Sequence, residues 1–271
     1  MDAAPTSGLP AGSDGTFASD LALAHALADA ADDLTLPRFR AHDLVVHTKP
    51  DLTPVTEADR AVEEMIRAEL ARERSEDAIL GEEFGSRGMG ERRWIIDPID
   101  GTKNYARGIP VWATLIALER DHVPVVGVVS APALGSRWSA ARGAGAQRDD
   151  EPVAVSKVAR IEDAHLAYDS VAAFEAIGRD AEFLALARRC WRTRGFGDFW
   201  SHVMVADGSI DIAVEVGGLN LWDLAAVQVI VEEAGGRFTD LAGVARADGG
   251  DAVTTNGLLH DEVLAAFPPR T

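Results

Sequence analysis

The sequence predicts an α/β protein whose first half has more antiparallel strand character than its second, and two observations support this. Two amphipathic helical segments open the chain, and apolar strand-like runs follow them as far as residue 129. From residue 165 onward, strand and helix patterns alternate, which is typical of sheets covered by helices. We expect a flexible tail over 1–16, an α+β unit over 17–155 and an α/β unit over 156–271.

The two helical segments carry recognisable start signals. Ser19 could cap the first helix, and Pro37 ends or kinks it. Thr56 starts the second helix, and Asp59 lies at the spacing of a capping box. The expected buried stripes are Leu23, Leu27, Ala30, Ala31 and Leu34 in the first helix, and Ala58, Val62, Met65, Ile66 and Leu70 in the second.

The remaining elements are predicted from hydrophobic periodicity and from Gly-rich or polar turn segments. We expect first-half strands over 78–80, 94–96, 111–118 and 123–129, of which the last two form a hairpin. Gly-rich, polar residues predict a loop over 143–151. In the second half we expect strands over 165–168, 210–214 and 252–255, and helices over 181–189, 199–206, 222–234 and 259–267.

Composition restricts the class of protein. Hydrophobic residues make up 47% and charged residues 26% of the 271 residues, as in an ordinary globular enzyme. No apolar run approaches the roughly 20 residues that cross a bilayer, so no membrane partner is expected. The N-terminus lacks the basic and apolar regions of a secretory signal, and Cys190 is the only cysteine. We therefore expect a cytoplasmic protein without intrachain disulfides.

The net charge of −18 argues against nucleic acid as a partner, because binding to phosphate backbones needs clustered Lys and Arg. A phosphorylated small molecule would also be repelled unless divalent cations lay between it and the protein. The excess of acids is thus either a hint of metal sites or simply a solvated surface.

The segment WIIDPIDGTKN (94–104) is the most informative stretch of the chain. Asp97 ends an apolar run and Asp100 follows three residues later, while Pro98 predicts a turn that leaves the sheet. Such a turn could aim both carboxylates at one point and expose the Ile99 carbonyl between them. Those hard oxygen ligands suit Mg²⁺ or Mn²⁺ better than zinc. The alternative is an ordinary Asp-Pro turn.

Other residues fit the same chemistry, although each has a structural alternative. Gly101 and Thr102 offer close backbone approach and N–H groups suited to a phosphate oxygen. Glu82 follows a strand, where the sites of α/β proteins lie. Asp223 begins a helix and could simply complement its dipole, and Asp59 could simply complete a capping box.

Taken together, these motifs resemble those of the inositol monophosphatase superfamily. The motifs are T-x-x-D (56–59), GEE (81–83), WIIDPIDGT (94–102) and WDLAA (222–226). The resemblance implies the layered αβαβα sandwich of the inositol monophosphatase and fructose-1,6-bisphosphatase type. It also implies two or three bound Mg²⁺ ions, for which Mn²⁺ can substitute. The implied ligands are Glu82, Asp97, Asp100, Asp223 and the Ile99 carbonyl, with Asp59 helping to hold the most weakly bound ion.

The resemblance also implies a mechanism. Glu82 and the Thr102 hydroxyl, with Asp59 beside them, would orient and activate a water for in-line attack on phosphorus. The amides of Gly101 and Thr102 would hold phosphate oxygens, and no protein nucleophile would be needed. Lithium should inhibit the enzyme, and a homodimer is expected. A non-catalytic relative should have lost one of the key residues, whereas this chain keeps Glu82, Asp97, Asp100, Thr102 and Asp223.

Further segments resemble the histidinol-phosphate phosphatase branch of the actinobacterial type. These segments are 48–59, 108–118, 131–138, 195–201 and 255–264. Asp198 stands where inositol phosphatases usually carry Ser, and with Glu215 it could face a cationic leaving group. The expected substrate-binding set is Gly101, Thr102, Asp100, Asp198, Glu215, Asp223 and Asn256. Inositol 1-phosphate, or a broader range of small phosphate esters, is the alternative substrate.

Three details stay open at this point. The loop from Glu215 to Trp222 is one residue longer than the usual spacing, which leaves the detailed role of Glu215 undecided. Asn256 either contributes to the pocket, within the chain or across a dimer interface, or is a turn residue. Trp112 either forms a pocket wall or packs in the core.

Overall fold

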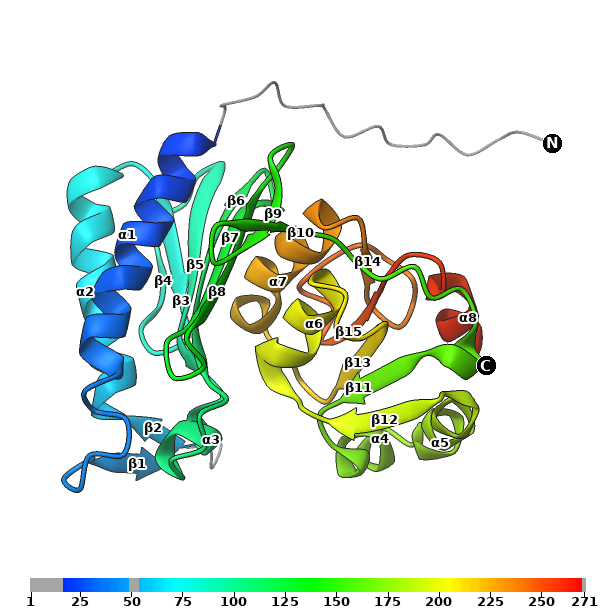
Figure 1. Ribbon diagram of the computed structural model, residues 1–271. Helices are drawn as coiled ribbons and strands as arrows, with labels where there is room; N and C mark the ends of the chain where they lie inside the picture. The colour runs from blue at the N-terminus through cyan, green and yellow to red at the C-terminus, as the bar shows by residue number, and fades with distance from the viewer. Residues whose placement is uncertain (1–16, 49–53, 270–271) are drawn as a thin grey trace.

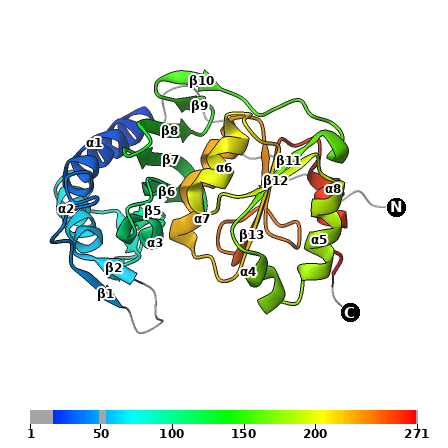
Figure 2. The ribbon, with the colours of Figure 1, turned by 60° about the horizontal axis from the view of Figure 1, so that its bottom comes forward.

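The computed structural model describes residues 17–48 and 54–269, which form five layers (Figures 1 and 2). Helices α1 and α2 cover one face of a large sheet, and α6 and α7 lie between that sheet and a second one. Helices α4, α5 and α8 cover the far side of the second sheet. The expected αβαβα sandwich is therefore confirmed. The expected tail over 1–16, and the extended stretch around residue 50, lie outside the described residues.

The outer helices are α1 (Ala18–Thr35) and α2 (Glu57–Glu73). Thr56 caps α2 as expected, since its Oγ1 accepts from the amides of Ala58 and Asp59 at 3.2 and 3.4 Å. The expected cap of α1 is wrong, because Phe17 occupies the N-cap position and no side chain caps it.

The buried face of α1 also differs from the expected stripe. It consists of Ala24, Leu27, Ala28 and Ala31, whereas Leu34 is 37% exposed. In a helix this rich in Ala and Leu, two adjacent stripes have similar hydrophobicity, so the period alone does not select between them.

The first sheet has eight strands in the order β10-β9-β8-β7-β6-β5-β3-β4. All neighbouring pairs are antiparallel except β3 with β5. The hairpin expected between 111 and 129 is β6–β7, and Asp121 and His122 at its turn both have positive φ. The strands are β3 (Ala78–Gly81), β4 (Gly85–Arg87), β5 (Arg92–Asp100), β6 (Ala113–Arg120), β7 (Val123–Ala131), β8 (Ser136–Ala141), β9 (Gly145–Arg148) and β10 (Glu151–Val153).

Two expectations about this sheet are wrong. The segment expected as a loop over 143–151 contains the edge hairpin β9–β10, which turns at Asp149 and Asp150 with positive φ. The chain does not leave the sheet at Pro98 either. Strand β5 continues through Pro98, and a bulge between Asp97 and Asp100 takes the proline out of the hydrogen-bonded ladder.

The middle layer contains α6 (Asp198–Ala206) and α7 (Leu221–Glu233). Every residue of α7 from 224 to 231 is buried, as expected for a helix with a sheet on each side. It lies very close to β7, since a Cβ on Gly127 would be 2.4 Å from the Ala226 carbonyl oxygen. The start of α7 is thereby held near the end of β5.

The second sheet has the order β12-β11-β13-β15-β14 and mixes parallel with antiparallel pairs, so the first half is the more antiparallel one, as expected. Its strands are β11 (His165–Tyr168), β12 (Arg192–Gly195), β13 (Ile212–Val216), β14 (Arg237–Thr239) and β15 (Asp251–Thr255). The other elements are β1 (Val46–Thr48), β2 (Pro54–Thr56), α3 (Thr102–Ala106), η1 (Ile161–Asp163), α4 (Val171–Ala176), α5 (Asp180–Arg189) and α8 (His260–Ala265). A unit boundary at 155/156 stays a prediction.

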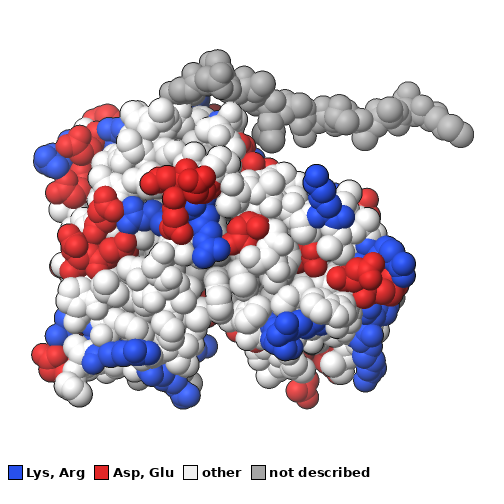
Figure 3. Space-filling model, viewed as in Figure 1, with Lys and Arg blue, Asp and Glu red and all other residues white. Residues whose placement is uncertain are grey.

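Charge on the surface is mixed. On the face shown in Figure 3, acidic and basic side chains are interspersed, and neither sign forms a single continuous field. Among the described residues, no helix combines the length and the apolar character needed to cross a membrane.

Candidate metal centre and substrate cavity

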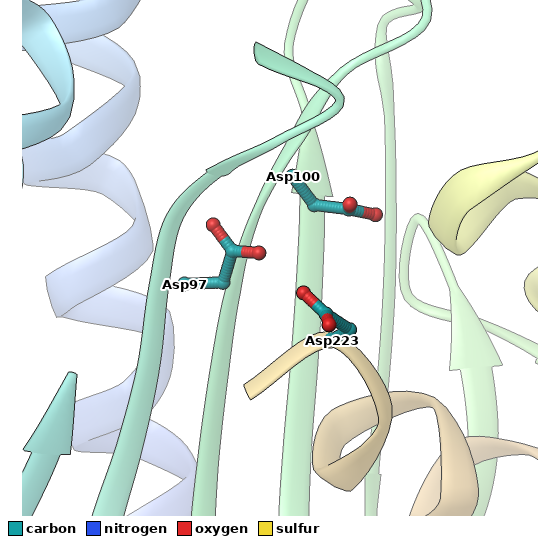
Figure 4. A group of neighbouring side chains, drawn as sticks. All are labelled: Asp97, Asp100 and Asp223. Atoms are coloured by element: carbon teal, nitrogen blue, oxygen red, sulfur yellow. The ribbon is translucent and has the colours of Figure 1, made fainter. Parts of the chain in front are cut away.

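Three aspartates from two distant parts of the chain meet at the end of β5 (Figure 4). Asp97 and Asp100 lie on either side of the β5 bulge, and Asp223 lies in the first turn of α7. One carboxylate oxygen from each lies within 4.8 Å of those of the other two. Backbone amides fix two of them: Phe199 N donates to Asp100 Oδ2 at 2.7 Å, and Asn220 N donates to Asp223 Oδ2 at 2.6 Å.

Burial and mutual repulsion make these carboxylates costly to ionise without a cation. Burial, reinforced by the charge of Glu82, raises the pKa of Asp97 well above its usual value. Burial and the charge of Asp198 do the same to the pKa of Asp100, and burial raises that of Asp223 to about 7. Asp97 Oδ1 is buried and finds no hydrogen-bond donor within the described part of the chain. Such a group of hard oxygen donors fits a divalent cation.

Glu82 follows β3 as expected and lines the same cavity. The turn that presents it is fixed by Glu63, a fully buried residue of α2 that the sequence pattern did not single out. Glu63 Oε2 accepts from Glu83 N at 2.7 Å, and Oε1 accepts from Phe84 N at 3.2 Å. Gly81 is required here, because a Cβ at that position would lie 2.0 Å from Glu63 Oε1.

Asp59 completes the capping box that its position predicts and also contacts the cavity lining, while its role toward a metal ion stays a prediction. As a capping residue it accepts from Thr56 N at 2.7 Å through Oδ2. Its Oδ1 lies 3.3 Å from the Thr102 hydroxyl, which is also 2.9 Å from the Ile99 carbonyl. Burial raises the pKa of Asp59 to about 6, with a contribution from the charges of Glu83 and Glu82.

A cavity of about 640 Å³ brings most of the expected site residues together. Its lining contains Glu82, Asp97, Ile99, Asp100, Gly101, Thr102, Asp198, Glu215 and Asp223. Gly101 has a positive φ of 80°, which allows the chain to turn from β5 into the short helix α3. Asp59 contacts this lining through Thr102.

Asn256 and Trp112, for which a pocket role was one of two alternatives, do not line this cavity. The Asn256 amide donates to Ser156 Oγ at 2.9 Å and to the Val158 carbonyl at 2.8 Å, and its Oδ1 accepts from two amides of the following turn. Within this chain Asn256 thus makes the contacts of a turn residue, and its contribution to a pocket across a dimer interface stays a prediction. Trp112 is fully buried and packs edge-on against Tyr105, with ring centroids 4.8 Å apart, so it belongs to the core.

One part of the cavity is acidic and contains Asp169, Asp198 and Glu215. Burial raises the pKa of Asp198 to about 7, and the charges of Glu215 and Asp169 add to this effect while Lys103 opposes it. Burial and the charge of Glu215 also raise the pKa of Asp169. A cationic group entering this part of the cavity would therefore be stabilised.

The lining also contains Lys103, Asn104, Asp169 and His202, which the sequence analysis did not identify as site residues. Signals existed for three of them, since Lys103 and Asn104 both lie in a segment that the sequence analysis singled out. Asn104 belongs to the WIIDPIDGTKN segment and donates to Asp198 Oδ2 at 3.1 Å. Asp169 directly follows β11, at the carboxyl end of a strand in a mostly parallel part of the sheet. His202 lies in an apolar stretch of α6, where sequence alone gives no indication of a site.

The loop before Trp222 is accommodated by glycine. After β13 ends at Val216, Gly217 and Gly218 adopt φ values of 109° and 92°, and Asn220 then occupies the N-cap of α7. Glu215 still lines the cavity despite the long loop. Its role toward a substrate stays a prediction.

Comparison with known proteins gives a consistent result. The inositol monophosphatase family profile matches residues 18–269. The histidinol-phosphatase of Streptomyces coelicolor is 54% identical, covering 94% of this chain and 98% of that protein. The histidinol-phosphatase of Mycobacterium tuberculosis is 55% identical, and the match covers 90% of this chain and 96% of that protein. Among solved structures, an IMPase of Thermotoga maritima has a TM-score of 0.83 at 32% identity, and the match covers 92% of this chain and 96% of that one. The carboxylate cluster therefore lies in a protein that belongs to the inositol monophosphatase family.

Proposed function

We propose that the chain is a Mg²⁺-dependent histidinol-phosphatase that hydrolyses L-histidinol phosphate to L-histidinol and phosphate. The family consists of metal-dependent phosphatases, so hydrolysis of a phosphomonoester follows from membership. The observation that supports the particular substrate is the acidic part of the cavity, formed by Asp169, Asp198 and Glu215 beside the aspartate cluster. Histidinol carries an ammonium group and an imidazole, which these carboxylates suit, whereas inositol is neutral.

The expected metal ligands fit this reaction. Glu82, Asp97, Asp100, Asp223 and the Ile99 carbonyl would hold two or three Mg²⁺ ions, or Mn²⁺ in their place, with Asp59 close to the weakest site. When bound, these ions neutralise the phosphate and make a bound water acidic enough to attack phosphorus.

The protein's own residues orient the water, the phosphate and the leaving group. Glu82 and the Thr102 hydroxyl orient the attacking water, and Asp59 holds that hydroxyl from behind at 3.3 Å. The amides of Gly101 and Thr102 bind phosphate oxygens where β5 turns into α3. Asp198 and Glu215 hold the leaving group, so the alcohol departs from a fixed position. Assembly as a homodimer and location in the cytoplasm remain predictions.

Magnesium-dependent phosphate release tests the proposal, with L-histidinol phosphate and inositol 1-phosphate compared under the same conditions. We expect kcat/KM to favour histidinol phosphate by at least about a hundredfold, which corresponds to about 2.7 kcal/mol. A preference for inositol 1-phosphate would retain the metal chemistry and overturn the assignment of the acidic residues.

A further inference from the structure

A buried histidine joins the acidic part of the cavity to the second sheet. His202 of α6 is 1% exposed, and its Nε2 lies 3.0 Å from Glu215 Oε2. Its Nδ1 lies 2.8 Å from the hydroxyl of Thr254 on β15, which is fully buried. The three side chains form one chain of hydrogen bonds from β15 to the cavity, because Glu215 and His202 line the cavity and Thr254 contacts His202.

The chemistry of the groups fixes the direction of these hydrogen bonds. An ionised carboxylate only accepts hydrogen bonds, so the Nε2 of His202 must donate to Glu215. A neutral imidazole has one N–H, and its Nδ1 must then accept a hydrogen bond from the Thr254 hydroxyl. Glu215 thus selects the tautomer of His202 with the proton on Nε2, the Thr254 hydroxyl fits that tautomer by donating to Nδ1, and His202 holds one oxygen of Glu215. The other carboxylate oxygen of Glu215 stays available to the cavity.

We infer that His202, oriented by Thr254, is a positioning residue that fixes the Glu215 carboxylate to receive the cationic part of the leaving group. This inference rests on the proposed function and adds the residues that make Glu215 selective. A carboxylate that must rotate or bind water before it meets a cation loses part of its interaction energy to that reorganisation. His202 removes that cost by holding Glu215 in one orientation.

A second buried histidine, His260, has different partners from His202 and provides a comparison for it. His260 is fully buried, and its two ring nitrogens lie 2.9 and 3.0 Å from the hydroxyls of Thr239 and Thr255. It has the same kind of threonine partner as His202 but joins two strands, and it is not part of the cavity lining. The carboxylate partner at the cavity thus distinguishes His202 from a purely structural histidine.

The test compares the cationic ester L-histidinol phosphate with the neutral-alcohol ester glycerol 1-phosphate, both at saturating Mg²⁺. For wild type, His202→Leu, His202→Gln and Thr254→Val, the measured quantity is the ratio of the two kcat/KM values. We expect His202→Leu to lower this ratio about tenfold, mainly through a higher KM for histidinol phosphate. His202→Gln, whose amide can still donate to Glu215, should recover most of the ratio, and Thr254→Val should give an intermediate value.

Two controls separate positioning from general damage. His260→Leu removes another buried imidazole with threonine partners, and it should change kcat/KM for both esters by the same factor. In a Glu215→Gln background, His202→Leu should change the ratio less than twofold, because the residue through which it acts has already been neutralised. An unchanged ratio in His202→Leu, or an equal fall for both esters, would overturn the inference.

The outcomes also separate this inference from the proposed function. If wild type strongly prefers histidinol phosphate and His202→Leu keeps that preference, the function stands and the role of His202 is refuted. If wild type itself shows no preference for the cationic ester, the proposed function fails, and the role of His202 fails with it.

Discussion

Replacing Gly81 by Ala should destabilise the protein far more than the size of a methyl group suggests. The new Cβ would lie 2.0 Å from Glu63 Oε1, so the Glu63 carboxylate would have to move. That carboxylate accepts from the amides of Glu83 and Phe84 and from Arg67 Nε, at 2.7, 3.2 and 2.7 Å. A hydrogen bond to a charged group contributes about 1.5–3 kcal/mol, so loss of the two amide bonds should cost about 3–6 kcal/mol.

Thermal unfolding in EDTA measures this cost without a contribution from bound metal. For a chain of this size, about 3 kcal/mol corresponds to a fall in Tm of at least about 6 °C. The displaced turn also carries Glu82, so the concentration of Mg²⁺ that gives half-maximal activity should rise. Gly90→Ala is the matched control, because its Cβ would have no neighbour closer than 3.7 Å. A Gly81→Ala protein that melts within about 2 °C of wild type would refute the reasoning.

Two further predictions follow from the charges of the site, and a third, on lithium, follows from the family resemblance. Asp97→Asn should abolish turnover, because it removes a proposed metal ligand. It should nevertheless raise the Tm in EDTA, since it removes a buried carboxylate that is costly to ionise. Retained turnover, measured by phosphate release, would contradict the metal assignment. In EDTA, stability should fall as pH rises from about 4 to 7, because burial raises the pKa of Asp59 to about 6 and of Asp223 to about 7, from a usual value of 3.8. The folded chain then binds more protons than the unfolded one, and melting with and without Mg²⁺ should show a larger gain from the metal at pH 8 than at pH 5. Lithium at millimolar order should inhibit phosphate release, and indifference to it would weaken the assignment.

The sequence predicted those elements whose signals are local. Thr56 and Asp59 have the spacing of a capping box, and α2 begins there. The apolar runs on either side of Asp121 gave the hairpin β6–β7. The edge hairpin at Asp149 and Asp150 was missed because its strands are short and polar, as edge strands often are.

The site residues likewise divide into those with a local sequence signal and those without one. Asp97, Asp100 and Asp223 could be chosen from their motifs, and the structure brings their carboxylates together. Pro98 was misinterpreted because a bulge lets a proline stay within a strand, and periodicity does not reveal bulges. Residues that act through tertiary contacts, such as Glu63 and His202, gave no local signal, since their partners are 20 or 13 residues away in sequence.

The position of α7 between the two sheets has a consequence for when the site becomes complete during synthesis. Asp97 and Asp100 leave the ribosome more than a hundred residues before Asp223, and α7 cannot be enclosed until the second sheet has formed against it. A nascent chain therefore carries only part of the proposed ligand set. A cation that needs the full set of ligands can bind tightly only after both halves have docked, so metal binding would mark a molecule that has finished folding.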